Sequence, residues 1–207
     1  IITNTDSIIS TAGDGINVAN VVGGSTIKNS GDITATTAGK FVIAGGDAVE
    51  TVTTTAGTLT GNTDLGAGND SFTASGGALV GSTFMGSDDD AANLTGTVDV
   101  TKAPQFDGGT GTDVLNIDGL TMNGFTAASN DATGNNLSLG SNITAFETIN
   151  LQNGANFTLT DNLDVSTLNP AGTKGQVNID EASRLNIAGM AGAAVTRTIN
   201  GDLNNAG

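Results

Sequence analysis

The stretch IKNSGDITAT, residues 27–36, places an Asn two residues after an Ile and follows it with a Ser-Gly-Asp turn and a second β-branched step. ITNTDSIIST (2–11) has a similar arrangement, and VTTTAGTLTG (52–61) keeps the spacing with Val and Thr in place of Ile and Asn. The three segments begin 25 residues apart. A repeat of this length is typical of a solenoid, in which each repeat forms one coil. The residues at matching positions are Ile2, Ile27 and Val52, followed by Asn4, Asn29 and Thr54.

A second pattern, an Asn between two aliphatic residues, recurs in the C-terminal half. Because side chains alternate across a strand, each such step predicts a strand with Asn on the face opposite the aliphatic residues. The four occurrences are Leu115-Asn116-Ile117, Ile149-Asn150-Leu151, Val177-Asn178-Ile179 and Leu185-Asn186-Ile187.

Short strands separated by Gly, Asn, Asp and Thr turns extend along the whole chain, and helical periodicity is almost missing. The pattern predicts an all-β fold, a right-handed parallel β-helix with roughly eight to ten coils. We expect residues 1–207 to form a single β-helix segment, with irregular loops around 85–93 and 101–112. Asn4 and Asn29 are expected to stack as an amide ladder at one corner. An antiparallel β-sandwich is the alternative.

The composition excludes several partners and favours a piece of a longer chain. There are 21 acidic and 6 basic residues, so the net charge of −15 repels nucleic acid and anionic membranes. No apolar run is long enough to span a bilayer, and residues 1–20 lack the features of a signal peptide. The sequence at both ends resembles an incomplete coil, so we predict that the chain is a segment of a longer polypeptide. Uncapped coils also predict weak end-to-end self-association.

Three segments carry a resemblance to a known family: LGAGNDSFTASGGALVGS (65–82), DGGTGTDVLNIDG (107–119) and ITAFETINLQNGANFTLTDN (143–162). Their order resembles the passenger domain of bacterial autotransporters, the type V secreted proteins. In that family a Phe-Glu-Thr-Leu-Asn step and a Gly-Ala-x-Trp-Thr-Leu-Thr step commonly follow the Gly-Asp turn. Residues 146–150 and 154–160 match these steps, with Phe157 where Trp is frequent.

The resemblance implies a surface-exposed β-helix on the extracellular side of the outer membrane, or secreted, and exported by its own C-terminal β-barrel translocator. It implies a structural stalk or an adhesin that attaches to a host cell surface or an extracellular matrix component, without enzymatic activity. The alternative is a calcium-stabilised secreted β-roll of the RTX type, or a surface-layer protein.

The alternative depends on FDGGTGTDVLNI (106–117), in which residues 108–116 fit the Gly-Gly-x-Gly-x-Asp-x-Leu-x pattern of calcium-binding β-rolls. Such sites need several consecutive nonapeptides, because each ion lies between neighbouring turns. Only one near match occurs, at 66–73, and neither has a tandem partner. We therefore interpret the motif as a tight turn capped by Asp113. If calcium binds, Asp107, Asp113 and Asp70 are its expected ligands; no other cofactor is expected.

Other acidic clusters give weaker signals. Adjacent Asp88, Asp89 and Asp90 predict a solvated loop, because like charges repel. The carboxylate pairs Asp161/Asp164 and Asp180/Glu181 are compatible with glycoside hydrolysis. The chain contains no Trp or Tyr to stack a sugar ring and no His to act as a base near neutral pH. We therefore predict no catalytic residues.

Overall fold

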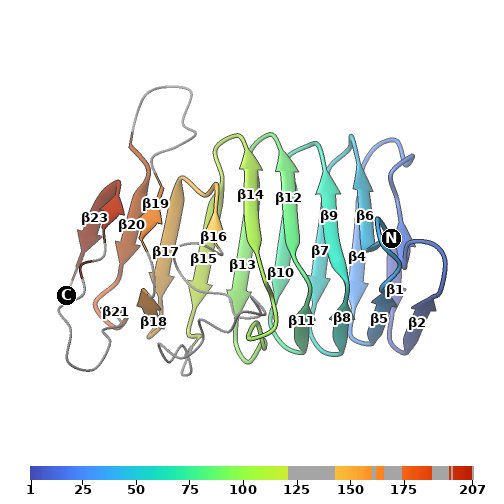
Figure 1. Cartoon of the computed structure of the whole chain (residues 1–207), viewed down its shortest axis with the longest axis horizontal. Helices are drawn as coiled ribbons and strands as arrows, with labels where there is room; N and C mark the ends of the chain where they lie inside the picture. Colours follow the sequence, from blue (N-terminus) through green and yellow to red (C-terminus); the bar gives the residue numbers. More distant parts are fainter. Residues whose placement is uncertain (121–142, 160–161, 166–173, 188–195, 197, 207) are drawn as a thin grey trace.

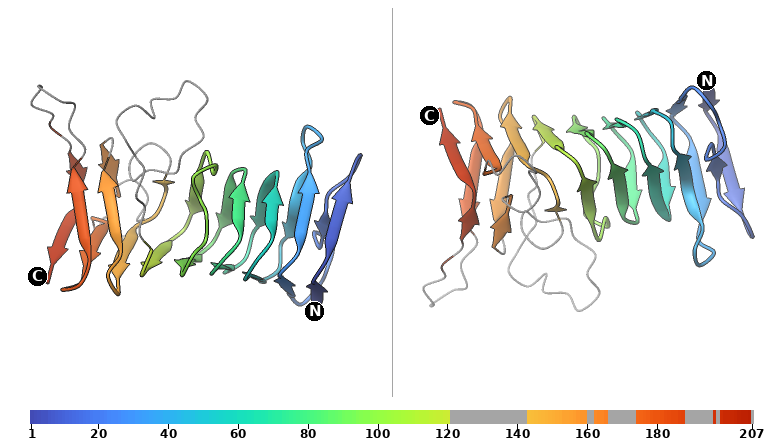
Figure 2. Two further views of the ribbon diagram at one scale, coloured as in Figure 1. Left: turned by 90° about the horizontal axis from the view of Figure 1, so that it is seen from below. Right: turned by 90° about the horizontal axis from the view of Figure 1, so that it is seen from above.

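The computed structural model describes residues 1–120, 143–159, 162–165, 174–187, 196 and 198–206. Over these residues the chain is all-β and contains no helix, hence none that could cross a membrane. Figure 1 shows the strands stacked side by side along one axis, with the two termini at opposite ends of the stack. The views of Figure 2, from below and from above, show the same elongated arrangement.

The longest sheet, which we call face A, contains nine strands within the described residues. Every neighbouring pair is parallel, and each strand pairs with the one that the chain forms on its next pass. A long, uniformly parallel sheet of this kind is what a β-helix requires. In spatial order they are β1 (Ile2–Asn4), β4 (Ser25–Asn29), β7 (Glu50–Thr54), β10 (Ser71–Ala74), β13 (Ala91–Thr95), β15 (Val114–Asp118), β17 (Thr148–Gln152), β20 (Gln176–Ile179) and β23 (Asp202–Asn205).

Two further sets of parallel strands complete the coils. Face B contains β2 (Ser7–Ser10), β5 (Asp32–Ala35), β8 (Thr58–Thr60) and β11 (Ala78–Val80), and the separate pair β18 (Asn156–Leu159) and β21 (Arg184–Ile187) follows later in the chain. Face C contains β3 (Ile16–Asn17), β6 (Phe41–Gly46), β9 (Asn62–Gly66), β12 (Thr83–Ser87), β14 (Phe106–Thr110) and β16 (Ile143–Thr144), with the later pair β19 (Leu163–Asp164) and β22 (Ile199–Asn200). The uniformly parallel pairing confirms the β-helix and excludes the antiparallel sandwich.

The core is a set of columns in which each apolar side chain lies over the equivalent one of the preceding coil. On face A, Ile27 pairs with Val52 and Val52 with Phe72, and all three side chains are fully buried. The ring of Phe72 meets that of Phe106 edge-on at 5.8 Å, and Phe106 stacks on Phe146 at 6.0 Å. Aromatic pairs at these separations contribute about 1 kcal/mol beyond the area that they bury. The side chains of Ile27 and Val52 therefore point inward.

An inward polar ladder lies two residues beyond the apolar column on the first face A strands. The Asn4 side chain donates to Asn29 Oδ1 at 2.7 Å, and the Asn29 side chain donates to Thr54 Oγ1 at 3.2 Å. All three residues are buried. Buried amides need such partners, because an unpaired one costs about 1–3 kcal/mol. The predicted Asn4–Asn29 ladder is therefore confirmed, and it extends to Thr54.

Glycines at the end of the face C strands let the backbones of successive coils approach closely. Gly66 pairs with Gly46, and Gly86 with Gly109. A Cβ built on Gly86 would lie 1.9 Å from the carbonyl oxygen of Gly66, and the φ angle of Gly86 is 120°. A side chain fits neither the space nor the backbone conformation at this position.

Of the two stretches that we expected to be irregular, 85–93 is largely strand, whereas 101–112 is strand only at residues 106–110. Strands β12 and β13 occupy most of 85–93, and β14 lies within 101–112. Only the tight turn of residues 88–90 separates β12 from β13. The clustered aspartates suggested a loop, but the coil accommodates them because the turn is short and one of them points inward.

Candidate functional site

Five carboxyl groups form a column inside the corner where face C leads into face A, which we call the carboxyl column. Four of its members immediately precede a face A strand, and Glu50 is the first residue of one. Since the strands are in register, the five side chains lie in successive coils. All are at most 3% exposed: Glu50, Asp70, Asp90, Asp113 and Glu147.

Four of the five carboxyls accept a backbone hydrogen bond from the equivalent residue of the preceding coil, whereas Glu50 Oε2 accepts one from the Gly46 amide at 3.3 Å. The Glu50 amide donates to Asp70 Oδ1 at 2.7 Å, and the Asp70 amide donates to Asp90 Oδ1 at 2.7 Å. The Asp90 amide donates to Asp113 Oδ1 at 2.8 Å, and the Asp113 amide to Glu147 Oε2 at 2.7 Å. One side-chain oxygen per coil thus satisfies a backbone donor that the turn leaves without a strand partner.

The second oxygen of four of these groups is buried without a hydrogen-bond partner. The atoms are Glu50 Oε1, Asp70 Oδ2, Asp90 Oδ2 and Asp113 Oδ2. A buried carboxylate whose second oxygen has no donor and no cation beside it is strongly destabilised, so the neutral acid or a cation-bound form is favoured.

Burial therefore dominates the ionisation of the column. It raises the pKa of Asp70 to about 8, although the hydrogen bond from Glu50 lowers that pKa, and the charges of Asp90, Glu50 and Asp88 raise it further. Burial likewise raises the pKa values of Asp90 and Asp113 to about 7. The pKa values of Glu50 and Glu147 are raised in the same way. At neutral pH the column therefore holds bound protons.

The outer side of this corner carries exposed acids that tie the turns together. Asp88 accepts a hydrogen bond from the Gly68 amide at 3.2 Å, and Asp89 accepts one from the Thr112 amide at 2.8 Å. The solvated position predicted for the three aspartates holds for Asp88 and Asp89. It is wrong for Asp90, which is 2% exposed, because strand alternation turns this residue into the corner.

The three residues predicted as calcium ligands do not all lie together. Asp70 and Asp113 belong to the carboxyl column, with Asp90 between them. Asp107 lies on the outward side of β14, where its Oδ1 accepts from the Gly109 amide at 3.1 Å and its Oδ2 from the Gln105 side chain at 3.2 Å. Within the described ranges, no group of three or more carboxylate, His or Cys side chains could hold a metal ion. Calcium binding stays a prediction.

The turn interpretation of FDGGTGTDVLNI agrees with the geometry. A Cβ on Gly109 would lie 1.9 Å from the Gly86 carbonyl oxygen, and a Cβ on Gly111 would lie 2.0 Å from that of Asp88. The two glycines therefore permit the close stacking of this turn on the preceding one. The expected capping of this turn by Asp113 is not seen: Asp113 Oδ1 accepts from the amide of Asp90 in the preceding coil, and its Oδ2 has no hydrogen-bond partner.

The two carboxylate pairs considered for glycoside hydrolysis differ in what the structure describes. Asp161 lies outside the described residues, so its pairing with Asp164 stays a prediction. Asp180 accepts hydrogen bonds from the amides of Asn153 at 2.6 Å and Ala182 at 3.1 Å, and Glu181 is exposed. Asp180 therefore serves as a cap for two neighbouring turns.

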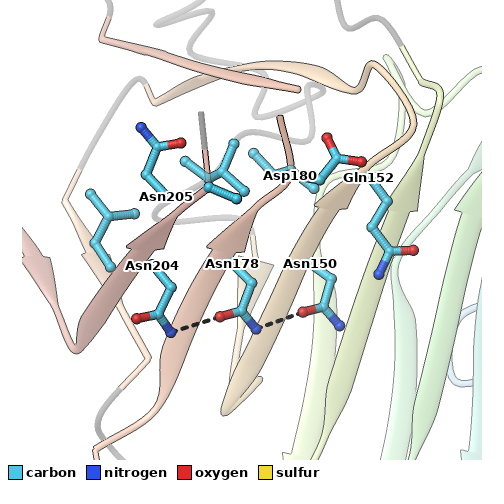
Figure 3. A pocket seen from close by; sticks show the side chains of 10 residues that line it. Asn150, Gln152, Asn178, Asp180, Asn204 and Asn205 are labelled. Atoms are coloured by element: carbon cyan, nitrogen blue, oxygen red, sulfur yellow. Dashed lines mark hydrogen bonds between the residues drawn. The ribbon is translucent and has the colours of Figure 1, made fainter. Parts of the chain in front are cut away.

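A row of asparagine side chains runs along the outward side of face A. Each donates to the preceding one at 2.7–2.9 Å, linking Asn93, Asn116, Asn150, Asn178 and Asn204. Figure 3 shows the last three in line, beside a shallow depression that Gln152, Asp180 and Asn205 also border. The outward position predicted for Asn116, Asn150 and Asn178 is confirmed. From here on, the amide ladder means this outward row, which is separate from the buried ladder of Asn4, Asn29 and Thr54.

Replacing Asn150 by Ala removes a donor to Asn116 and an acceptor for Asn178. Because both bonds are half-exposed, we expect a loss of about 1 kcal/mol in the free energy of unfolding. Urea denaturation measures it, with the outward Thr148→Ala on the same strand as the control. A larger loss for the control would contradict the stabilising role of the amide ladder.

Sequence reasoning identified two members of the carboxyl column and missed Glu50, Asp90 and Glu147. A signal was present: an acid stands at or just before the start of five consecutive face A strands. The separations of 20, 20, 23 and 34 residues are unequal, and a 25-residue period does not align them.

Comparison of the chain with protein-family models, curated proteins and solved structures finds no match.

Proposed function

We propose that this chain is a segment of a rod on the surface of a bacterium, the β-helical passenger of an autotransporter, and that it acts as a stalk or adhesin. In this role the segment extends the rod and provides a lateral contact surface, and it catalyses no reaction. Its partners are host-cell or matrix components, and a translocator domain elsewhere in the polypeptide exports it.

The observation that carries this proposal is the continuous stack of parallel strands with a polar lateral face. Neighbouring coils are joined by strand pairing, by the buried columns and by the amide ladder, so the stack behaves as a stiff spacer. Outward hydroxyl and amide groups cover face A, for example at Thr53, Thr73 and Asn93. A surface of this kind offers hydrogen bonds over a long contact area, as attachment to a polar polymer requires.

Localisation on the producing cells tests the proposal. An antibody against this segment is expected to label intact cells, and external protease is expected to abolish the labelling while a cytoplasmic marker stays intact. An in-frame deletion of the segment should reduce attachment to matrix-coated surfaces. Labelling only after the cells are permeabilised would contradict the proposed location.

A calcium-stabilised β-roll or surface-layer protein is the second candidate, favoured by the unpartnered oxygens of Asp70 and Asp113. The autotransporter proposal predicts that millimolar calcium raises the melting temperature only slightly, through screening of a net charge of −15. Magnesium at the same ionic strength is the control. A saturable stabilisation specific to calcium, and lost in Asp113→Asn, would favour the second candidate.

A further inference from the structure

We infer that the carboxyl column, made of Glu50, Asp70, Asp90, Asp113 and Glu147, is a proton-binding switch that stabilises the rod in acid and destabilises it as the pH rises through neutrality. The inference concerns the folded chain itself and does not depend on where the rod is displayed.

The first argument is the geometry of the stack. Hydrogen bonds of 2.7–2.8 Å hold the carboxyls of Asp70, Asp90, Asp113 and Glu147 against the backbone of the preceding coil, which keeps these groups turned away from water. Coils in a parallel stack are about 4.8 Å apart. Five ionised groups at that repeat, all nearly inaccessible to solvent, would repel one another along the whole column.

The second argument is the set of buried oxygens without a partner. Each carboxyl has one oxygen that accepts a backbone amide, and in four of them the other oxygen meets no donor. A proton on that second oxygen removes the charge and leaves the backbone bond intact. Protonation is therefore the simplest way for the column to remain folded.

The charged groups around the column favour the same outcome. Those that act on Asp70, Asp90 and Asp113 are their neighbours in the column together with Asp88, Asp89 and Asp107 at the turns. All of them are acids. No lysine or arginine in the described ranges forms an ion pair with the column, so only the backbone hydrogen bonds favour the ionised form, and burial outweighs them.

The direction of the pH dependence follows from proton counting. An Asp in an unfolded chain has a pKa of about 3.9. In the folded chain the pKa is about 8 for Asp70 and about 7 for Asp90 and Asp113. Between these values the folded state binds more protons, so its stability decreases as the pH rises from about 4 to about 8. Below that window both states are protonated and the stabilisation is complete.

A proton fits the column better than a metal ion does. The column is linear, with one carboxyl per coil, and no three metal-binding side chains converge in the described part of the chain. Divalent calcium needs about six to eight oxygen ligands. The space between two successive carboxyls offers two unpartnered oxygens at most.

Urea unfolding at pH 5, 6, 7 and 8, at constant ionic strength and with a chelator present, tests the inference. Each group that titrates in this way raises the unfolding equilibrium constant up to tenfold per pH unit within its window. Asp90→Asn mimics the neutral acid. Between pH 5 and pH 7, we expect the unfolding equilibrium constant of this variant to increase by a factor at least ten times smaller than the factor for the wild type. Asp6→Asn removes the same charge from an exposed position and should keep the wild-type slope.

A second measurement does not depend on any variant. Carbon-13 shifts of the side-chain carboxyls, followed through a pH titration of the wild type, are expected to move above pH 6 for Asp70, Asp90 and Asp113. Titration of all three near pH 4 would overturn the inference, as would equal slopes for Asp90→Asn and the wild type. If added calcium instead moved these titrations below pH 5 with saturable stabilisation, the column would be a cation site and the inference would be wrong.

Discussion

Gly86→Ala is expected to lower the free energy of unfolding by more than about 4 kcal/mol, or to prevent folding. The new Cβ would lie 1.9 Å from the Gly66 carbonyl oxygen, and φ at this position is 120°. Because Gly66 is itself packed on Gly46, the backbone cannot move aside without separating the coils. Circular dichroism during urea denaturation measures the loss.

Gly39→Ala separates backbone strain from the clash. Gly39 also has a positive φ, 72°, but a Cβ there would meet nothing within 4 Å. We expect this control to cost about 1 kcal/mol, which is the strain of an alanine in the left-handed region. Equal losses for the two variants would contradict the close approach of the coils at Gly66 and Gly86.

Ile27→Asp is expected to cost several kcal/mol, because it places an ionisable group in a core that is one side chain wide. Ile27 is fully buried over Val52, and its neighbours in the column offer no hydrogen-bond partner. The substituted carboxyl would also lack the backbone donor that each member of the carboxyl column has. Urea denaturation at pH 7 measures the effect.

Thr26→Asp is the matched control, since it adds the same charge one residue earlier on β4, where the side chain points outward and is half-exposed. We expect it to cost less than about 1 kcal/mol. If both variants lost the same stability, the inward and outward assignment on β4 would be wrong.

The repeated segments were sufficient to predict that the face A strands stack on one another, and which of their side chains point inward or outward. Because Ile2, Ile27 and Val52 recur at a constant spacing, the coils that carry them stack in register, which buries Ile27 and Val52, while Ile2 of the first coil stays partly exposed. The same spacing aligned Asn4 with Asn29, and the Asn of each aliphatic-Asn-aliphatic step faced outward by strand alternation. These features depend on local periodicity, which a single sequence contains.

The carboxyl column could be predicted only in part, since it depends on burial that no local pattern reveals. Asp90 follows two other aspartates, and adjacent like charges predict a solvent-exposed loop. Asp90 is buried only because its turn stacks tightly on the turn that contains Asp70. Glu50 and Glu147 differ from the aspartates in length yet occupy equivalent places. The unequal coil lengths between them hide the alignment.

Pairs of cysteines on face A test the register of the stack most directly, and the natural chain contains no cysteine to interfere. Thr53 pairs with Thr73, and Thr73 with Asn93. A disulfide needs Cα atoms about 4.4–6.8 Å apart, which adjacent parallel strands provide and strands two coils apart do not. The account predicts rapid intramolecular disulfide formation in Thr73→Cys/Asn93→Cys under mild oxidation and none in Thr53→Cys/Asn93→Cys. Cross-linking of the second pair, or failure of the first in a folded protein, would contradict the stacked β-helix.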